Sequence, residues 1–141
     1  MSILVNAGTK VTAKTAKTIQ WGVQTATTGL DYLTNKVKPT QPPRVYQETS
    51  QAFAALQAKQ VDAVLLDTAI VLQQAAASNG KFKVIAQYKT NESYGAIFPK
   101  GSKLRKKVDA VIKTLKANGT LGKLAQKNIG GDPAKIPVLK P

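Results

Sequence analysis

Hydrophobic positions along the chain alternate between short strand-like runs and longer runs with helical spacing. Apolar runs typical of strands lie at 3–5, 21–24, 44–46, 61–66, 82–86 and 94–98. Between them, apolar residues recur every three or four positions, which predicts helices at 28–37, at 68–77 and from a cap at Thr49 or Ser50 to Gln57. This alternation predicts an α/β fold with a mainly parallel sheet and helices on both faces.

The pattern changes after Gly101, where an apolar stripe predicts an amphipathic helix over 102–117. A shorter helix follows and ends at Gly130 and Gly131, and the tail at 132–141 contains three prolines and is expected to be extended. The stripe consists of Leu104, Val108, Val111, Ile112 and Leu115. Between Lys100 and Lys127, nine Lys and Arg residues accompany one acid, Asp109. A solvated basic face opposite the stripe is the simpler interpretation, and a membrane-binding or partner-binding helix is the alternative.

Composition restricts the chemistry that the chain can perform. The 141 residues suit one globular domain, and 43% of them are apolar. Cysteine and histidine are both absent, which excludes thiol nucleophiles, Cys/His metal sites and imidazole bases. No Gly-x-Ser-x-Gly elbow, phosphate loop or paired carboxylate spacing is present, so we expect no enzyme activity, no cofactor and no metal.

Neither a membrane span nor an export signal is visible in the sequence. No apolar run approaches the roughly 18 residues of a span, and residues 1–7 are too short and lack the charged start of a signal peptide. As written, the chain is therefore expected to be cytoplasmic when expressed.

The formal net charge is +14, from 21 Lys and Arg against 7 Asp and Glu, and suggests a polyanionic partner. Only two of the 21 cations are Arg, however, and no motif that enters a nucleic-acid groove is present. We expect no specific nucleic-acid partner, and salt-sensitive sticking to polyanions instead.

Two strand ends carry candidate ligand contacts. Thr27 and Thr28 follow the strand at 21–24 and begin a helix, where hydroxyls and free N–H groups attract anions or oxygen-rich ligands. Asp67 follows the apolar strand at 61–66, where a carboxylate is costly unless it caps a helix, pairs with a cation or lies at the mouth of a cleft. Because ligands bind at the carboxyl ends of parallel strands, both positions fit a binding site. Structural capping remains the alternative for each.

Five stretches of the sequence form a recognisable series. They are 21–29 (WGVQTATTG), 51–57 (QAFAALQ), 61–67 (VDAVLLD), 94–101 (YGAIFPKG) and 118–121 (NGTL). Taken together, they resemble the second half of the polar amino-acid-binding proteins, the family 3, type II periplasmic solute-binding proteins of ABC importers. The resemblance covers almost the whole chain, with the stretches in the family's order.

The resemblance implies two α/β lobes joined by crossing strands, with the amino acid held between them. Residues 1–99 then correspond to the second lobe, with hinge strands at 3–5 and 94–98. Residues 100–131 correspond to C-terminal helices that normally pack on the first lobe, and 132–141 to an extended tail. The first lobe, with the aromatic residue and the arginine that contact the ligand, has no counterpart in this chain.

Site roles also follow from the resemblance, residue by residue. Asp67 matches the acid that receives the α-ammonium group of the ligand, and Thr28 the turn residue whose hydroxyl and N–H face the ligand. Thr27 and Gly29 occupy neighbouring cleft positions. Ala26 stands where the family usually has glycine, and the Cβ of the alanine is expected to crowd the turn or to oppose a positive φ.

The expected function is half of the binding site of an extracytoplasmic amino-acid-binding protein, for a polar or basic amino acid, with weak or no binding by this half alone. The implied partners are a free amino acid, the first lobe and an ABC permease. The parent protein is expected to be periplasmic or a cell-surface lipoprotein. Because the stripe on 102–117 lacks its usual cover, it is expected to fold back on its own lobe or to meet another copy in a dimer or exchanged-element dimer. A small basic module that binds nucleic acid or another polyanion is the alternative function.

Overall fold

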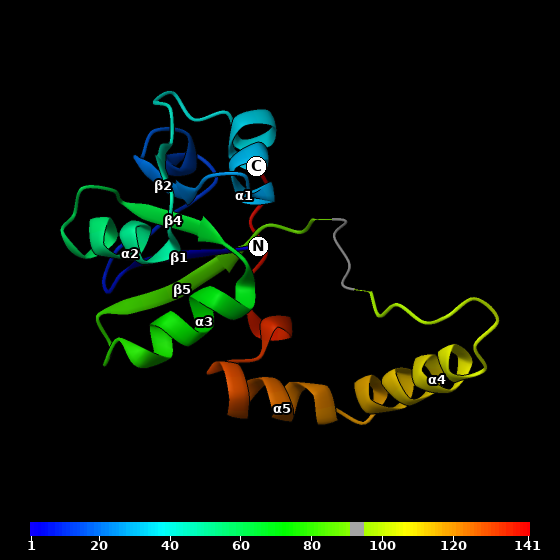
Figure 1. Ribbon diagram of the computed structural model, residues 1–141. Helices are drawn as coiled ribbons and strands as arrows, with labels where there is room; N and C mark the ends of the chain where they lie inside the picture. The colour runs from blue at the N-terminus through cyan, green and yellow to red at the C-terminus, as the bar shows by residue number, and fades with distance from the viewer. Residues whose placement is uncertain (91–94) are drawn as a thin grey trace.

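The computed structural model describes residues 1–90 and 95–141, and most of them form one α/β lobe (Figure 1). Its five-stranded sheet has the order β3-β2-β4-β1-β5. The strands are β1 (Ser2–Asn6), β2 (Trp21–Gln24), β3 (Arg44–Tyr46), β4 (Ala63–Leu66) and β5 (Phe82–Gln87).

The sheet is mixed rather than mainly parallel in its hydrogen bonding. β2 pairs in parallel with β3 and β4, whereas β1 pairs antiparallel with both β4 and β5. Four strands therefore run in one direction, and only β1, inserted between β4 and β5, runs against them. The alternation of strands and helices predicts the parallel crossovers, but it does not show where the first strand enters the sheet.

Helices cover both faces of the sheet, as the sequence predicts. On one face lie α1 (Thr28–Tyr32) and the π-helical turn η2 (Leu33–Val37), which together occupy the helix expected at 28–37. On the other face lie α2 (Thr49–Gln57) and α3 (Thr68–Ala77). The expected α/β lobe is therefore confirmed.

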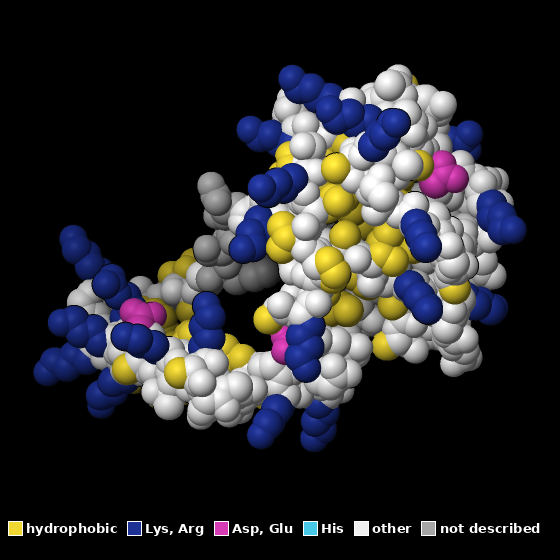
Figure 2. Space-filling model, turned by 180° about the vertical axis from the view of Figure 1, so that it is seen from behind, with side chains coloured by type: hydrophobic (Ala, Val, Ile, Leu, Met, Phe, Trp, Pro, Cys, Tyr) yellow, Lys and Arg dark blue, Asp and Glu magenta, His cyan; other side chains and the backbone are white. Residues whose placement is uncertain are grey.

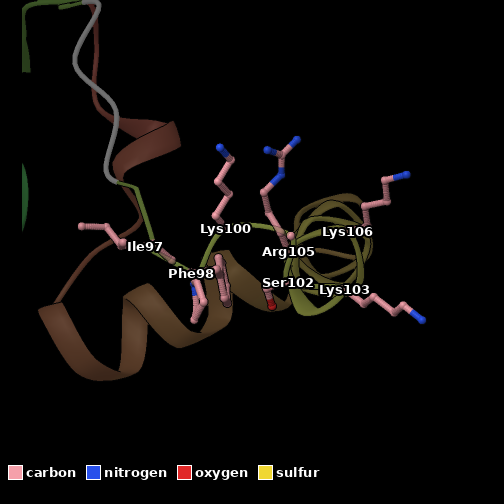
Figure 3. A pocket seen from close by; sticks show the side chains of 10 residues that line it. Ile97, Phe98, Lys100, Ser102, Lys103, Arg105 and Lys106 are labelled. Atoms are coloured by element: carbon pink, nitrogen blue, oxygen red, sulfur yellow. The ribbon is translucent and has the colours of Figure 1, made fainter.

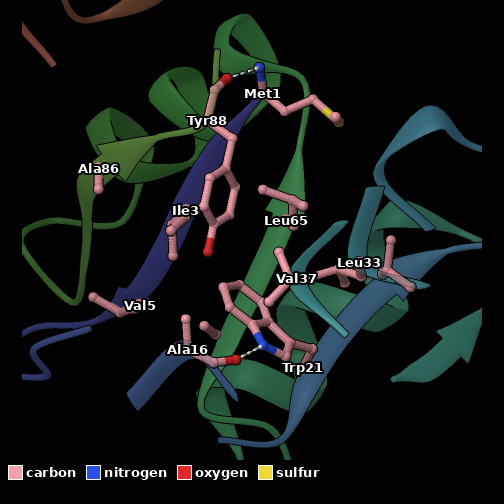
Figure 4. Close-up of a cluster of buried hydrophobic side chains, with 12 residues drawn as sticks. Met1, Ile3, Val5, Ala16, Trp21, Leu33, Val37, Leu65, Ala86 and Tyr88 are labelled. Carbon is pink, nitrogen blue, oxygen red and sulfur yellow. Dashed lines mark hydrogen bonds between the residues drawn. The ribbon is translucent and has the colours of Figure 1, made fainter. Parts of the chain in front are cut away.

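The core beneath α1 and η2 is organised around two aromatic side chains (Figure 4). Trp21 is fully buried, and its indole N–H donates to the carbonyl of Ala16 at 2.7 Å, which ties the short 3-10 helix η1 (Thr15–Lys17) to the sheet. Tyr88 is also buried and lies 5.0 Å from Tyr32 between ring centroids. These contacts fix the position of β2, at whose end the candidate site begins.

Two helices form an arm that extends from the lobe (Figure 1). The arm consists of α4 (Leu104–Ala117) and α5 (Thr120–Ile129), and neither helix contains a buried residue. Only its end reaches α3, where Gly130 and Gly131 lie close to Ala76 and Leu72. The expected stripe therefore does not fold back on its own lobe.

The tail after the arm returns to the sheet. A 3-10 turn, η3 (Pro133–Lys135), precedes a bridge between Val138 and Gln87, and Leu139 N–H donates to the carbonyl of Gln87 at 2.8 Å. The tail is thus partly paired with β5 rather than simply extended.

Among the expected boundaries, those of β4 and α2 differ from the structure for identifiable reasons. β4 begins at Ala63, not Val61, because Asp62 turns outward and accepts a hydrogen bond from the N–H of Gln20. α2 already includes Thr49 and has Glu48 as its cap, with the N–H of Glu48 donating to Gln51.

The expected hinge strand at 94–98 does not form over 95–98, and residue 94 lies outside the described residues.

Within the described chain, no helix has both the length and the apolar character of a membrane span.

Candidate functional site

The candidate site lies where β2 and β4 end at the same edge of the sheet. These strands are parallel neighbours, so their carboxyl ends, Gln24 and Leu66, lie at one edge. The chain then turns into α1 after β2, and Asp67 leads directly into α3 after β4. The site is therefore built from two strand-to-helix junctions.

A cavity of about 290 Å³ joins the two junctions and brings together three of the four expected ligand residues. It is lined by Gln24, Thr27, Thr28, Leu66, Asp67 and Ile70. Gly29, the fourth expected residue, is not among them. It is buried, and a Cβ added there would lie 3.1 Å from the carbonyl oxygen of Leu65, so Gly29 permits close packing of α1 on β4.

The two threonines have different hydrogen-bonding roles. The hydroxyl of Thr27 donates to the carbonyl of Gln24 at 2.7 Å and accepts from the N–H of Leu30 at 3.3 Å, so Thr27 caps α1. Thr27 therefore has the structural capping role that the sequence allows, and it also lines the cavity. Thr28 is exposed, and its hydroxyl donates to the sulfur of Met1 at 3.7 Å, a weak contact that a ligand oxygen can replace.

Asp67 is half-buried and occupies the N-cap position of α3, but its side chain makes no capping hydrogen bond to that helix. Capping therefore does not explain why a carboxylate follows this buried strand. The same side chain lines the cavity opposite Thr27 and Thr28, where a carboxylate can receive a cationic group.

The turn that leads into α1 adopts a left-handed conformation at a residue with a side chain. Ala26 has φ +53°. This is the left-handed region, which glycine adopts easily and which the family's usual glycine at this position leads one to expect. The turn forms nevertheless, and the N–H of Thr25 donates to the carbonyl of Tyr46 at 2.8 Å. Ala26 therefore gives the turn strain that glycine would not.

Three cavity residues, Gln24, Leu66 and Ile70, are not among the sequence candidates. Both ends of the Gln24 amide are held, since Nε2 donates to the carbonyl of Gln47 at 3.1 Å and Oε1 accepts from the hydroxyl of Thr49 at 2.7 Å. The positions of Gln24, Leu66 and Ile70 in the predicted elements could have identified all three. Gln24 and Leu66 end the two strands, and Ile70 lies one helical turn after Asp67.

A second cavity of about 250 Å³ adjoins the first, because Thr28 lines both. Its other lining residues include Met1, Asp31 and Asn35. The two cavities therefore form one continuous hollow at this edge of the sheet, which extends from Asp67 past Thr28 to α1.

This architecture is that of one lobe of a type II periplasmic-binding-protein fold. Solved structures of amino-acid-binding proteins share it over almost the whole chain. The chain is 31% identical to the arginine-, lysine-, histidine-binding protein ArtJ from Geobacillus stearothermophilus, with a TM-score of 0.58 over 94% of this chain and 59% of ArtJ. It is 26% identical to an ancestral arginine-binding protein bound to glutamine, with a TM-score of 0.61 over 92% of this chain and 59% of that one.

A more distant protein shares the fold, and a curated relative is similar in sequence. The L-cystine solute receptor of Neisseria gonorrhoeae has a TM-score of 0.73 at 18% identity, over 93% of this chain and 56% of the receptor. The glutamine-binding protein GlnH of Bacillus subtilis is 34% identical over 91 residues, which are 64% of this chain and 33% of GlnH. No family model matches the chain.

These similarities confirm the resemblance to the polar amino-acid solute-binding proteins. The chain covers only 33% of GlnH and 59% of ArtJ, less than two thirds of either. The relatives are binding proteins and receptors rather than enzymes.

Proposed function

We propose that the lobe forms one wall of an amino-acid-binding cleft. Asp67 receives the α-ammonium group of the amino acid, and the hydroxyl and N–H of Thr28 bind its polar oxygen atoms. The observation that supports this assignment most directly is the cavity that Asp67 shares with Thr27 and Thr28, although Thr27 and Asp67 lie 40 positions apart in the sequence.

A polar or basic amino acid is the proposed ligand. The names of the relatives refer to glutamine, arginine, lysine and histidine, and ABC transport is named for GlnH. The cavity offers one carboxylate, two hydroxyls and one fixed amide, against the apolar side chains of Leu66 and Ile70. We propose that the protein delivers such an amino acid to an ABC permease outside the cytoplasmic membrane.

The wall formed by these residues binds the amino acid weakly or not at all by itself. High affinity for a small zwitterion requires charge-assisted bonds to both the ammonium and the carboxylate, and enclosure of most of the ligand surface. The cavity supplies a partner for the ammonium and lies open at the edge of the sheet, so a second wall has to supply the rest.

Calorimetry with glutamine, arginine, lysine and histidine tests this proposal. We expect this lobe alone to bind these amino acids with dissociation constants of about 1 mM or weaker. A dissociation constant of 1 mM corresponds to a binding free energy of roughly −4 kcal/mol. A dissociation constant tighter than about 1 μM, or roughly −8 kcal/mol, would contradict the proposed division of the site between two walls.

A further inference from the structure

Gln24 connects the candidate cavity to a third strand-to-helix junction. It ends β2 and lines the cavity together with Asp67 and Thr28. Its side-chain amide bonds to the segment that joins β3 to α2. Nε2 donates to the carbonyl of Gln47 at 3.1 Å, and Oε1 accepts from the hydroxyl of Thr49 at 2.7 Å. A wall of the cavity is therefore held by two residues that do not line it.

These two bonds fix the orientation of the Gln24 amide. A backbone carbonyl can only accept a hydrogen bond, so the nitrogen end of the amide has to face Gln47. The hydroxyl of Thr49 then donates to the oxygen end. A flipped amide would place its oxygen against the carbonyl of Gln47 and lose that bond. Gln24 therefore presents one fixed arrangement of donor and acceptor, whereas an unrestrained amide could present either.

The hydroxyl of Thr49 is not needed to begin α2. Glu48 is the cap of that helix, and its N–H donates to the side chain of Gln51 at 3.0 Å. Thr49 is the first residue of the helix and is half-buried, with its hydroxyl on Gln24. This hydroxyl therefore serves the cavity wall rather than the start of the helix.

The fixed amide has a bonding capacity that matches a particular class of side chain. An amide has two N–H groups and two acceptor positions, and the bonds to Gln47 and Thr49 use one of each. One further donor and one further acceptor belong to the same group. A carboxamide side chain offers the complementary acceptor and donor, whereas an ammonium or guanidinium group only donates and a carboxylate only accepts.

Charge at this edge of the sheet also favours a neutral side chain. Asp67 is the one acid among the residues that line the cavity, and the proposed function assigns it to the α-ammonium group. The adjoining cavity has one acid, Asp31, together with one cation, Lys36. Figure 2 shows Lys and Arg side chains spread over the molecule with few acids among them, and the net charge is +14. A cationic side chain would lose hydration here against an unfavourable potential.

The larger cavity beside α4 does not offer the same ligand a second site. It has a volume of about 720 Å³ and is lined by residues 96–103 together with Arg105 and Lys106. Figure 3 shows Lys100 and Arg105 extending in the same direction beside it. None of its lining residues is an acid, so an α-ammonium group finds no carboxylate there.

We propose that Thr49 is a positioning residue for the amino-acid site, and that the Gln24 amide it holds selects ligands with a carboxamide side chain. The inference rests on the proposed function, because Asp67 and Thr28 hold the α-group, and it adds the class of side chain. The amide of Gln24 donates to the side-chain oxygen of the ligand and accepts from its side-chain nitrogen. Thr49 acts through Gln24 and does not contact the ligand.

NMR titration of the full chain with glutamine, lysine and glutamate tests the inference. These amino acids share the α-group, so differences in their dissociation constants report on the side chain alone. We expect glutamine to bind at least about fivefold more tightly than lysine or glutamate, the factor of one hydrogen bond between neutral groups. Thr49→Val should abolish this preference by weakening the binding of glutamine while leaving that of lysine unchanged.

Two further variants separate positioning from a structural role. Thr49→Ser retains the hydroxyl and should retain the preference for glutamine. Gln24→Leu should lose it as Thr49→Val does, so the test does not depend on the folding of one variant. The matched control is Thr120→Val, a half-buried threonine at the first residue of α5, which should leave all three dissociation constants unchanged.

The outcomes distinguish this inference from the proposed function. Amide shifts at Thr28 and Asp67 with equal affinity for the three amino acids would overturn the inference and leave the proposed function standing. The same conclusion would follow if the preference for glutamine persisted in Thr49→Val and Gln24→Leu, or if Thr49→Val weakened glutamine and lysine equally. An absence of shifts at Thr28 and Asp67 with every amino acid would overturn both.

Discussion

Ala26 shows how a single residue can oppose the turn that builds a site. Its φ of +53° lies in the left-handed region, where a Cβ meets the neighbouring carbonyl and the conformation costs about 1–2 kcal/mol. The turn is held by its surroundings, including the bond from Thr25 to Tyr46 and the cap at Thr27. The rest of the lobe therefore compensates for strain at the candidate site.

Ala26→Gly should relieve this strain and raise the free energy of unfolding by about 0.5–1 kcal/mol, because the relief exceeds the entropy that glycine adds to the unfolded chain. Urea denaturation followed by the fluorescence of Trp21, which is fully buried, measures the change. The matched control, Ala54→Gly in the exposed middle of α2, should lower stability by about 1 kcal/mol. Equal losses in both variants would contradict the strained turn.

The buried position of Tyr88 conflicts with the polarity of its hydroxyl group. Its side chain is buried, and its hydroxyl has no hydrogen-bond partner within the part of the chain that the structure describes. Burial, with a smaller contribution from Tyr32, raises the pKa of Tyr88 from 10 to about 12. A buried polar atom without a partner costs free energy that phenylalanine would not.

Tyr88→Phe should therefore increase the free energy of unfolding by about 1 kcal/mol at neutral pH. Because the folded pKa is raised, the neutral phenol favours the folded state, and this contribution is complete below pH 10 and lost as pH rises towards about 12. The variant should lack that alkaline loss in urea denaturation curves. Tyr46→Phe, on edge strand β3, serves as the control. A loss of stability in Tyr88→Phe at neutral pH would indicate a partner for the hydroxyl.

At the scale of elements, the local sequence predicts the helices and strands whose ends are marked by residues close to them in the chain. β2, β3 and α3 match the expected bounds because turn residues or a clear change of periodicity mark each end. The cap of α2 was misplaced because Glu48 and Gln51 form it, and Thr49 instead bonds to Gln24. The strand expected at 94–98 fails over 95–98, because a short apolar run becomes a strand only when a neighbouring strand pairs with it.

The contact between the arm and α3 depends on glycine. Gly130 has φ +77°, and a Cβ there would lie 2.6 Å from the Cβ of Ala76. Gly119, between α4 and α5, has a similar φ of +76°, but a Cβ there would meet nothing within 4 Å. The two glycines therefore share the backbone strain of substitution and differ in the clash with α3.

Gly130→Ala should detach the end of the arm from α3, whereas Gly119→Ala should retain that contact. Hydrogen exchange measures the difference through the amides of α5, which should exchange faster only in the Gly130 variant. Equal acceleration in both variants would show that backbone strain, rather than contact with Ala76, controls the position of the arm.

At the scale of the whole molecule, the sequence predicts that Thr28 and Asp67 converge, but it does not predict where β1 enters the sheet. The convergence of Thr28 and Asp67 follows from one rule, that parallel neighbouring strands end at the same edge. Gly29 does not line this cavity, because its backbone packs on Leu65, and proximity along the chain does not show such packing. The insertion of β1 depends on long-range pairing, which local periodicity does not encode.

Mapping of ligand contacts by NMR tests the central claim most directly. With arginine or glutamine added at high millimolar concentration, amide shifts should concentrate at residues 24–28 and 66–70, which contain the cavity lining. Asp67→Asn should abolish them, whereas the control Asp109→Asn on the arm should not. Shifts that are scattered over the lysine-rich surface, or that persist in Asp67→Asn, would contradict an amino-acid site at this edge of the sheet.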